Sequence, residues 1–188
     1  TSRWLHIYLS MISFIIVLFF SVTGLTLNHA DYFQKNVVIT QNKGTVNPNW
    51  VNATDTLKIQ KLEIAEYFRN KYKAKGAVAD FRISDNEISF SFKAPGYAAD
   101  AFIDRSNATY TFMETNQGLM GFINDLHKGR DTGKTWLWVI DISAILMTLV
   151  SLSGLILLLF LKKKRLSGII LLILGFVLVY ITYHYWGQ

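Results

Sequence analysis

Four histidines are the residues of this chain best suited to chemistry, and each lies near the end of an apolar segment. His6 and His29 bracket the first segment, His127 precedes the second, and His184 lies near the end of the third. A neutral imidazole nitrogen ligates iron well, and two imidazoles facing each other across an apolar slot can hold a haem. The pattern therefore favours a membrane protein that carries electrons.

The residues that are missing narrow the choice of cofactor. The chain has no cysteine, which excludes disulfides, thiolate-ligated iron–sulfur clusters and the covalent attachment of c-type haem. It also lacks the glycine-rich loops of nucleotide and flavin sites and the common hydrolase motifs. Haem b is the cofactor that we predict, with electrons arriving from a quinol in the membrane pool or from another protein.

Three long apolar segments must position these histidines. Each has about the 20 residues that a helix needs to cross a bilayer core of about 30 Å. The segments are Trp4–Leu27, Trp136–Leu161 and Leu166–Trp186. We predict an integral membrane α-helical protein in which residues 1–29, 132–161 and 166–188 hold three transmembrane helices. Residues 30–131 then form an external domain between the first two helices, and residues 162–165 form a turn.

Basic residues predict the orientation of these helices. Arg3 precedes the first segment, and Lys162 to Arg165 form an uninterrupted basic turn after the second. The positive-inside rule places both in the cytoplasm of a bacterial inner membrane, so the external domain and the C-terminus are expected in the periplasm. Residues 30–134 hold 14 lysines and arginines against 12 acidic residues. This near balance is no evidence for nucleic-acid binding.

The external segment has the pattern of a small α+β domain. Residues 30–56 read as irregular, and Leu57–Lys75 reads as an amphipathic helix with Leu57, Leu62, Ile64, Ala65, Phe68 and Tyr72 on its apolar side. Alternating apolar residues then predict a four-stranded meander with three turns. The strands are 79–83, 87–93, 98–104 and 109–114, with turns at Asp85-Asn86, Pro95-Gly96 and Ser106-Asn107. Residues 118–128 read as a short helix on the membrane surface.

Several short motifs occur in a family-like order along the chain. They are Arg3-Trp4-Leu5-His6, Thr23-Gly24-Leu25, Asp125-Leu126-His127-Lys128-Gly129 and Ser153-Gly154-Leu155. With the helix and meander between them, these motifs resemble the PepSY-associated transmembrane family, most like its VciB-type inner-membrane ferric reductases. The resemblance implies a PepSY-like domain, haem held between helices by histidines, and reduction of ferric iron in support of ferrous-iron uptake.

His29 and His127 are the expected axial ligands of a haem near the outer surface, because both lie on that side. Ser21, Thr23 and Gly24 would give a thin helix face for the macrocycle. Residues that could pair with the haem propionates are Lys128, Arg130 and Lys134. His184 is a further outer candidate, as a replacement for either ligand or as a ligand to a second subunit's haem.

His6 belongs to the opposite end of its helix. A rise of ~1.5 Å per residue separates it from His29 by roughly 35 Å, so the two cannot bind one iron. If His6 ligates a haem, its partner comes from another protomer, most simply a second His6 in a homodimer, or from a non-histidine group. Alternatively, His6 and Arg3 contact lipid headgroups or a quinone.

Acidic residues offer two weaker candidates. Asp141 is the one carboxylate inside a predicted span, where acids are costly and often functional. It could take a proton from quinol, hold an imidazole N–H, or form an ion pair with Arg130 or Lys134. Outside the spans, Asp100, Asp104 and Glu114 could gather loosely near a ferric substrate, but their spacing favours an ordinary solvated sheet face.

Three functions follow from these patterns. The preferred one is a dimeric b-type cytochrome that reduces Fe(III), or a ferric chelate, outside the membrane. The second is a membrane-anchored PepSY module that binds or regulates partners without redox activity. The third, a subunit of an iron transporter, is weaker because three spans with one acid offer no continuous polar path.

Overall fold

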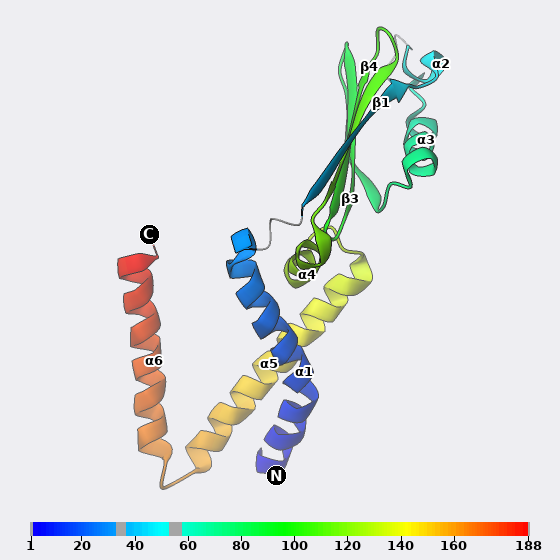
Figure 1. The fold of residues 1–188 in the computed structure, drawn as a ribbon. Coiled ribbons are helices and arrows are strands. Elements are labelled where there is room, and N and C mark those ends of the chain that lie inside the picture. The colour runs from blue at the N-terminus through cyan, green and yellow to red at the C-terminus, as the bar shows by residue number, and fades with distance from the viewer. Residues whose placement is uncertain (1, 33–36, 53–57, 188) are drawn as a thin grey trace. The chain divides into compact units, whose positions relative to one another are not determined.

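A computed structural model describes residues 2–32, 37–52 and 58–187, with three long helices and one antiparallel sheet (Figure 1). The contacts within the chain divide it into two compact units. One contains the residues up to Phe19 together with those from Val139 onward, and the other contains Phe20–Trp138.

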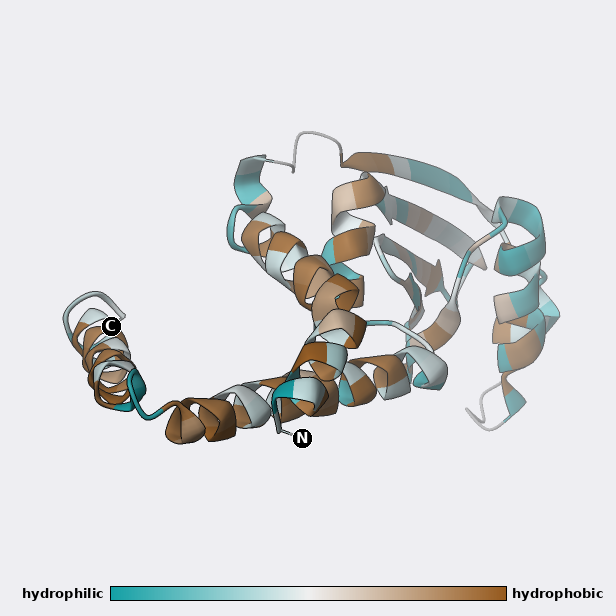
Figure 2. Ribbon diagram, turned by 90° about the horizontal axis from the view of Figure 1, so that it is seen from below, coloured by the Kyte–Doolittle hydropathy of each residue, from teal (hydrophilic) through white to brown (hydrophobic). Residues whose placement is uncertain are grey.

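Three helices are long and apolar enough to cross a membrane. They are α1 (Ser2–Asn28), α5 (Lys134–Phe160) and α6 (Arg165–Trp186). All three are mostly hydrophobic along their length, whereas the short turn between α5 and α6 is hydrophilic (Figure 2). The helices coincide with the three segments predicted from hydropathy, apart from one or two residues at their ends.

Small hydroxyl side chains are the buried residues of the membrane-helix unit. Ser13 of α1, with Ser143 and Ser153 of α5, is less than a tenth exposed, whereas the large apolar side chains of these helices face outward. Each of these three hydroxyls bonds to a carbonyl of its own helix, which pairs its O–H in an apolar environment. Small residues allow two helices to approach closely. The described residues of α6 include no buried one.

The second unit is built on a five-stranded antiparallel sheet in the order β1-β5-β4-β3-β2. Four of its strands confirm the predicted meander, and the three predicted turns lie between them. The strands are β1 (Val38–Thr45), β2 (Ala77–Ile83), β3 (Glu87–Ala94), β4 (Tyr97–Asp104) and β5 (Thr109–Asn116).

Strand β1 corrects the prediction that residues 30–56 are irregular. It pairs along its whole length with β5, from Val38 opposite Asn116 to Thr45 opposite Thr109. It is an edge strand with no buried residue, so its sequence lacks the alternation that marks a half-buried strand. A short helix, α2 (Pro48–Val51), follows and is capped by the side chain of Asn47.

Helix α3 (Lys61–Tyr72) covers one face of the sheet and completes the core. Ile64, Ala65 and Phe68 are buried, and the ring of Phe68 packs against Phe112 of β5 at 5.1 Å between centroids. Leu62, predicted on the apolar side, is instead 69% exposed, because about 100° of rotation per residue places it roughly 200° around the helix from the buried Ile64, outside the face that contacts the sheet. The predicted first residue, Leu57, lies outside the described residues.

Lys71 forms hydrogen bonds that link the exposed side of α3 to the sheet. The amino group of Lys71 donates to the hydroxyls of Tyr67 and Tyr110 at 2.8 and 2.9 Å, and Tyr72 also bonds to Tyr110. The hydrogen bond to Tyr110, followed by that to Tyr67, raises the pKa of Lys71. Desolvation raises the pKa of Tyr110. The cluster is structural and ties α3 to β5.

Candidate functional site

His127 lies in the last turn of α4 (Gly118–Lys128), where its ring contacts α1. Its Nδ1 is 2.6 Å from the hydroxyl oxygen of Thr23. A Cβ placed on Gly24 would lie 3.5 Å from the His127 Cε1, so the ring rests on a helix face without a side chain. The ring also meets Phe20 edge-on at 5.3 Å. One imidazole of the predicted outer site is therefore held by defined contacts.

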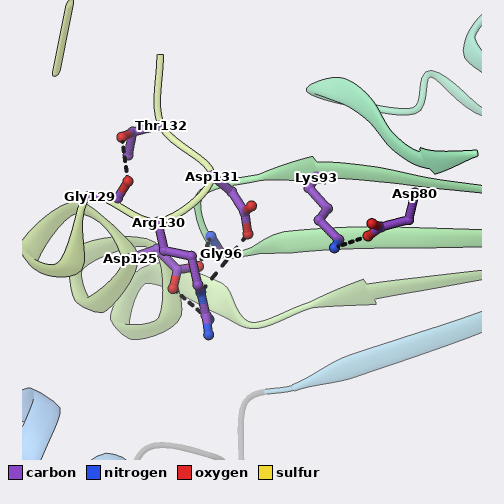
Figure 3. Close-up of polar contacts among 8 residues, drawn as sticks. All are labelled: Asp80, Lys93, Gly96, Asp125, Gly129, Arg130, Asp131 and Thr132. Carbon is purple, nitrogen blue, oxygen red and sulfur yellow. Dashed lines mark hydrogen bonds and ion pairs between the residues drawn. The ribbon is translucent and has the colours of Figure 1, made fainter. Parts of the chain in front are cut away.

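Asp125, two residues before His127, attaches α4 to the sheet domain (Figure 3). Its side chain is 4% exposed and accepts a hydrogen bond from the backbone N–H of Gly96 at 2.8 Å. Its other carboxylate oxygen is 2.6 Å from Nη2 of Arg130. Gly129 ends α4 at a φ of +67°, which returns the chain so that Arg130 reaches Asp125. The turn between β3 and β4 is therefore bonded directly to the last turn of α4.

Trp136, in the first turn of α5, also supports the end of α4. Its indole Nε1–H donates to the backbone carbonyl of Leu126 at 2.8 Å. A second contact joins α4 to α1, where the hydroxyl of Thr26 shares its hydrogen between the carbonyl of Thr23 at 2.9 Å and Oδ1 of Asn124 at 3.1 Å. The three residues just before His127 are thus held by groups from α1, α5 and the sheet.

His6 occupies a site of the same design in the membrane-helix unit. Its Nδ1 is 2.8 Å from the hydroxyl of Ser153 on α5. A Cβ placed on Gly154 would lie 3.1 Å from the His6 Cε1, which is tighter than ordinary contact. In both the His127 site and the His6 site, therefore, a hydroxyl residue followed by glycine contacts an imidazole from another helix.

The other two predicted ligands have simpler surroundings. His29 is exposed just beyond the end of α1, with its ring 5.8 Å from that of Tyr32. Within the described residues, no hydrogen bond or ring contact joins His29 to His127. His184 is exposed on α6, stacked 6.1 Å from Tyr180 and edge-on to Tyr185. Both remain predictions as iron ligands.

The charged candidates separate into engaged and exposed groups. Arg130 is paired with Asp125 and lies 3.9 Å from Asp131, so its guanidinium already serves the α4 anchor. Lys128 and Lys134 are exposed and form no ion pair with another described residue. Asp141 is an exposed residue of α5.

The acidic strand residues do not gather. Alternation along the strands places Glu114 on the face covered by α3, where it accepts a hydrogen bond from Tyr97. Asp100 and Asp104 lie on the opposite face, and the pKa of Asp104 is lowered by hydrogen bonds from Ser106. No group of three or more metal-ligating side chains occurs in the part of the chain that the structure describes.

Sequence reasoning overlooked the residues that support the histidines. Ser153, Gly154 and Asp125 were not among the predicted site residues, although all three belong to motifs that the sequence displays. The signal was present as two similar triplets, Thr23-Gly24-Leu25 and Ser153-Gly154-Leu155. Their role depends on a partner helix, which a motif alone does not identify.

Long apolar helices that hold imidazoles on hydroxyl–glycine pairs, together with an antiparallel sheet covered by a helix, define a membrane protein with an α+β domain. The chain belongs to the PepSY_TM-like family, whose model matches residues 1–186. No curated protein and no solved structure matches the chain.

Proposed function

We propose that this protein is a b-type cytochrome of the bacterial inner membrane that reduces ferric iron, free or chelated, on the periplasmic side. The observation that supports this most is the placement of His127, whose Nδ1 bonds to Thr23 beside the bare helix face at Gly24. A ligating histidine usually engages its other ring nitrogen with a nearby acceptor, which fixes the ring and raises its basicity. A bound haem would supply a one-electron carrier.

The donor set of this chain fits haem at His127. The ring is half-buried and lies beside Phe20 and the small residues of α1, an apolar setting that suits a porphyrin. The second axial ligand in the proposal is His29, with His184 as its replacement. Lys128 and Lys134 are the better propionate partners, because Arg130 is paired with Asp125.

The direction of electron flow follows from the proposed topology. With the basic turn between α5 and α6 in the cytoplasm, His127 and the sheet domain lie on the periplasmic side. Electrons come from quinol or a cytoplasmic-side donor, and the ferric substrate accepts them outside. A second copy of the chain would supply the partner that His6 needs.

The test is a pigment measurement on protein produced with ample haem and purified in detergent. Wild-type protein should show a Soret band that shifts on dithionite reduction, and a pyridine haemochrome assay should give a defined haem content. His127→Ala should lose the outer haem and most ferric reduction, whereas Leu119→Ala, an exposed position on the same helix, should not. Colourless wild-type protein would refute the proposal and favour the anchored binding module.

Parallel variants identify the second ligand. His29→Ala and His184→Ala should be compared for haem content and for the change from low-spin to high-spin absorption. The predicted pairing requires that His29→Ala, and not His184→Ala, lose the low-spin spectrum. The opposite result would assign His184.

A further inference from the structure

We propose that the hydroxyls of Ser153 and Thr23 are positioning groups that hold His6 and His127 as the Nδ1–H tautomer. Each imidazole then presents Nε2 as its ligating nitrogen. That the ligand is haem iron rests on the proposed function, but the tautomer itself does not. The inference makes His6 a prepared ligand, equal in design to His127, rather than a headgroup contact.

Two short contacts of the Ser153 hydroxyl determine the tautomer of His6. A serine hydroxyl has one hydrogen to donate and two lone pairs that accept. The Ser153 hydroxyl lies 2.8 Å from the carbonyl of Val150, which can only accept. When its hydrogen is used there, the 2.8 Å contact with His6 requires the imidazole Nδ1–H to be the donor.

The other hydroxyls of α5 show the same use of the hydroxyl hydrogen. Ser143, Thr148 and Ser151 each donate to the carbonyl four residues earlier, at 2.7 to 2.9 Å. In an apolar environment an O–H without an acceptor is costly, and the helix carbonyl is the nearest one. Like these residues, Ser153 donates its hydroxyl hydrogen to a carbonyl of α5. The hydrogen in its contact with His6 then comes from the imidazole Nδ1–H.

The other ring nitrogen of each imidazole, Nε2, is the one left to bind a ligand. A neutral imidazole carries one N–H, so protonation at Nδ1 leaves a lone pair on Nε2. Among the described residues, neither His6 nor His127 makes a hydrogen bond through Nε2. A lone pair on Nε2 is what a metal ion needs from an imidazole.

Thr23 offers His127 the same arrangement. Its hydroxyl is 2.6 Å from Nδ1 and can direct its hydrogen to the carbonyl of Phe20, at 3.4 Å, in its own helix. We therefore expect the Nδ1–H tautomer at His127 as well as at His6.

A third hydroxyl–glycine pair shows that the motif alone is insufficient. Ser167-Gly168 lies at the start of α6. A Cβ on Gly168 would meet the side chain of Leu158 at 2.2 Å, and the described residues place no histidine there. The imidazole partner, not the pair, distinguishes the two sites.

The tautomers can be measured in haem-free protein in nanodiscs by nitrogen NMR of labelled histidine, with His6 and His127 assigned by His→Asn variants. Wild-type His6 should show a protonated Nδ1 and an unprotonated Nε2. Ser153→Ala should shift His6 toward Nε2–H, and Ser153→Thr should restore the wild-type spectrum. Ser151→Ala, which removes a neighbouring hydroxyl of α5, is the control and should change nothing.

The same variants are then titrated with hemin. If His6 ligates haem, Ser153→Ala should weaken binding at that site by ten- to a hundredfold and alter its reduction potential, with rescue by Ser153→Thr. An Nε2–H tautomer in wild-type protein, or a His6 spectrum unchanged by Ser153→Ala, overturns the inference. If the tautomers agree but hemin never binds, the inference stands and the proposed cytochrome fails.

Discussion

The two histidine sites share one design but differ in what supports them. His127 is held by contacts from the sheet, from α1 and from the first turn of α5, through Asp125, Thr23 and Trp136. His6 rests on α5 alone, at Ser153 and the tightly fitting Gly154. The position of the His127 ring therefore depends on the folding of the sheet domain, whereas that of His6 depends only on the packing of two membrane helices.

Replacing Asp125 should have the largest effect and should disturb the His127 site without disturbing the His6 site. Asp125→Ala leaves the Gly96 N–H and the Arg130 guanidinium without their carboxylate, and loss of such a buried partner costs about 3 kcal/mol. Chemical unfolding of the sheet domain should report that loss, together with an altered His127 NMR signal and an unchanged His6 signal. Asp131→Asn, at the weaker 3.9 Å contact, is the matched control. Equal effects on both histidines would show that the sites are not independent.

The two glycines should separate the sites in the opposite direction. Gly154→Ala adds a Cβ 3.1 Å from the His6 ring, whereas Gly24→Ala adds one at an ordinary 3.5 Å from His127. We expect Gly154→Ala to displace His6 at a cost of about 1 to 2 kcal/mol, and Gly24→Ala to be nearly neutral. Haem content and the two histidine spectra provide the measurement. A larger loss from Gly24→Ala would contradict the described packing.

Trp136 offers a smaller and more local test. Trp136→Phe removes the indole N–H that bonds to the Leu126 carbonyl, worth about 1 kcal/mol. It should loosen the last turn of α4, which hydrogen exchange at residues 126–128 would detect, without changing His6. Trp138→Phe alters an exposed tryptophan two residues away and should have no effect on that exchange. Identical exchange in both variants would remove Trp136 from the site.

Lys71 provides the smallest effect and a control distant from either histidine. Its pKa is raised in the folded state, mainly by the hydrogen bond to Tyr110, so its stabilisation is present below the ordinary lysine pKa and is lost as the pH rises through the folded value. Because Lys71 is exposed, solvent screening keeps the effect of Lys71→Met below about 1 kcal/mol at neutral pH. The difference in unfolding free energy between wild type and variant should shrink at strongly alkaline pH. A constant difference would show that charge plays no part.

Much of the fold could be predicted because its signals are local. Hydropathy located α1, α5 and α6, and alternation with turn residues located β2 to β5. Strand β1 escaped because an edge strand exposed on both faces has no apolar period, and only pairing with β5 forms it. Leu62 was misplaced because the apolar residues of α3 span a wider arc than the face that contacts the sheet, and only the packed structure shows which part of that arc is buried.

The amino-acid types and their order identify four imidazoles, in a chain without thiols, as the candidate iron ligands, and place them near the ends of segments that can cross a membrane. The packing of helices and strands establishes which hydroxyl meets which imidazole, that Asp125 accepts a hydrogen bond from Gly96, and that Glu114 lies on the other face from Asp100. These two kinds of information differ in how far along the chain they reach. Composition and periodicity act over a few neighbouring residues, whereas each of these contacts depends on how separate elements pack.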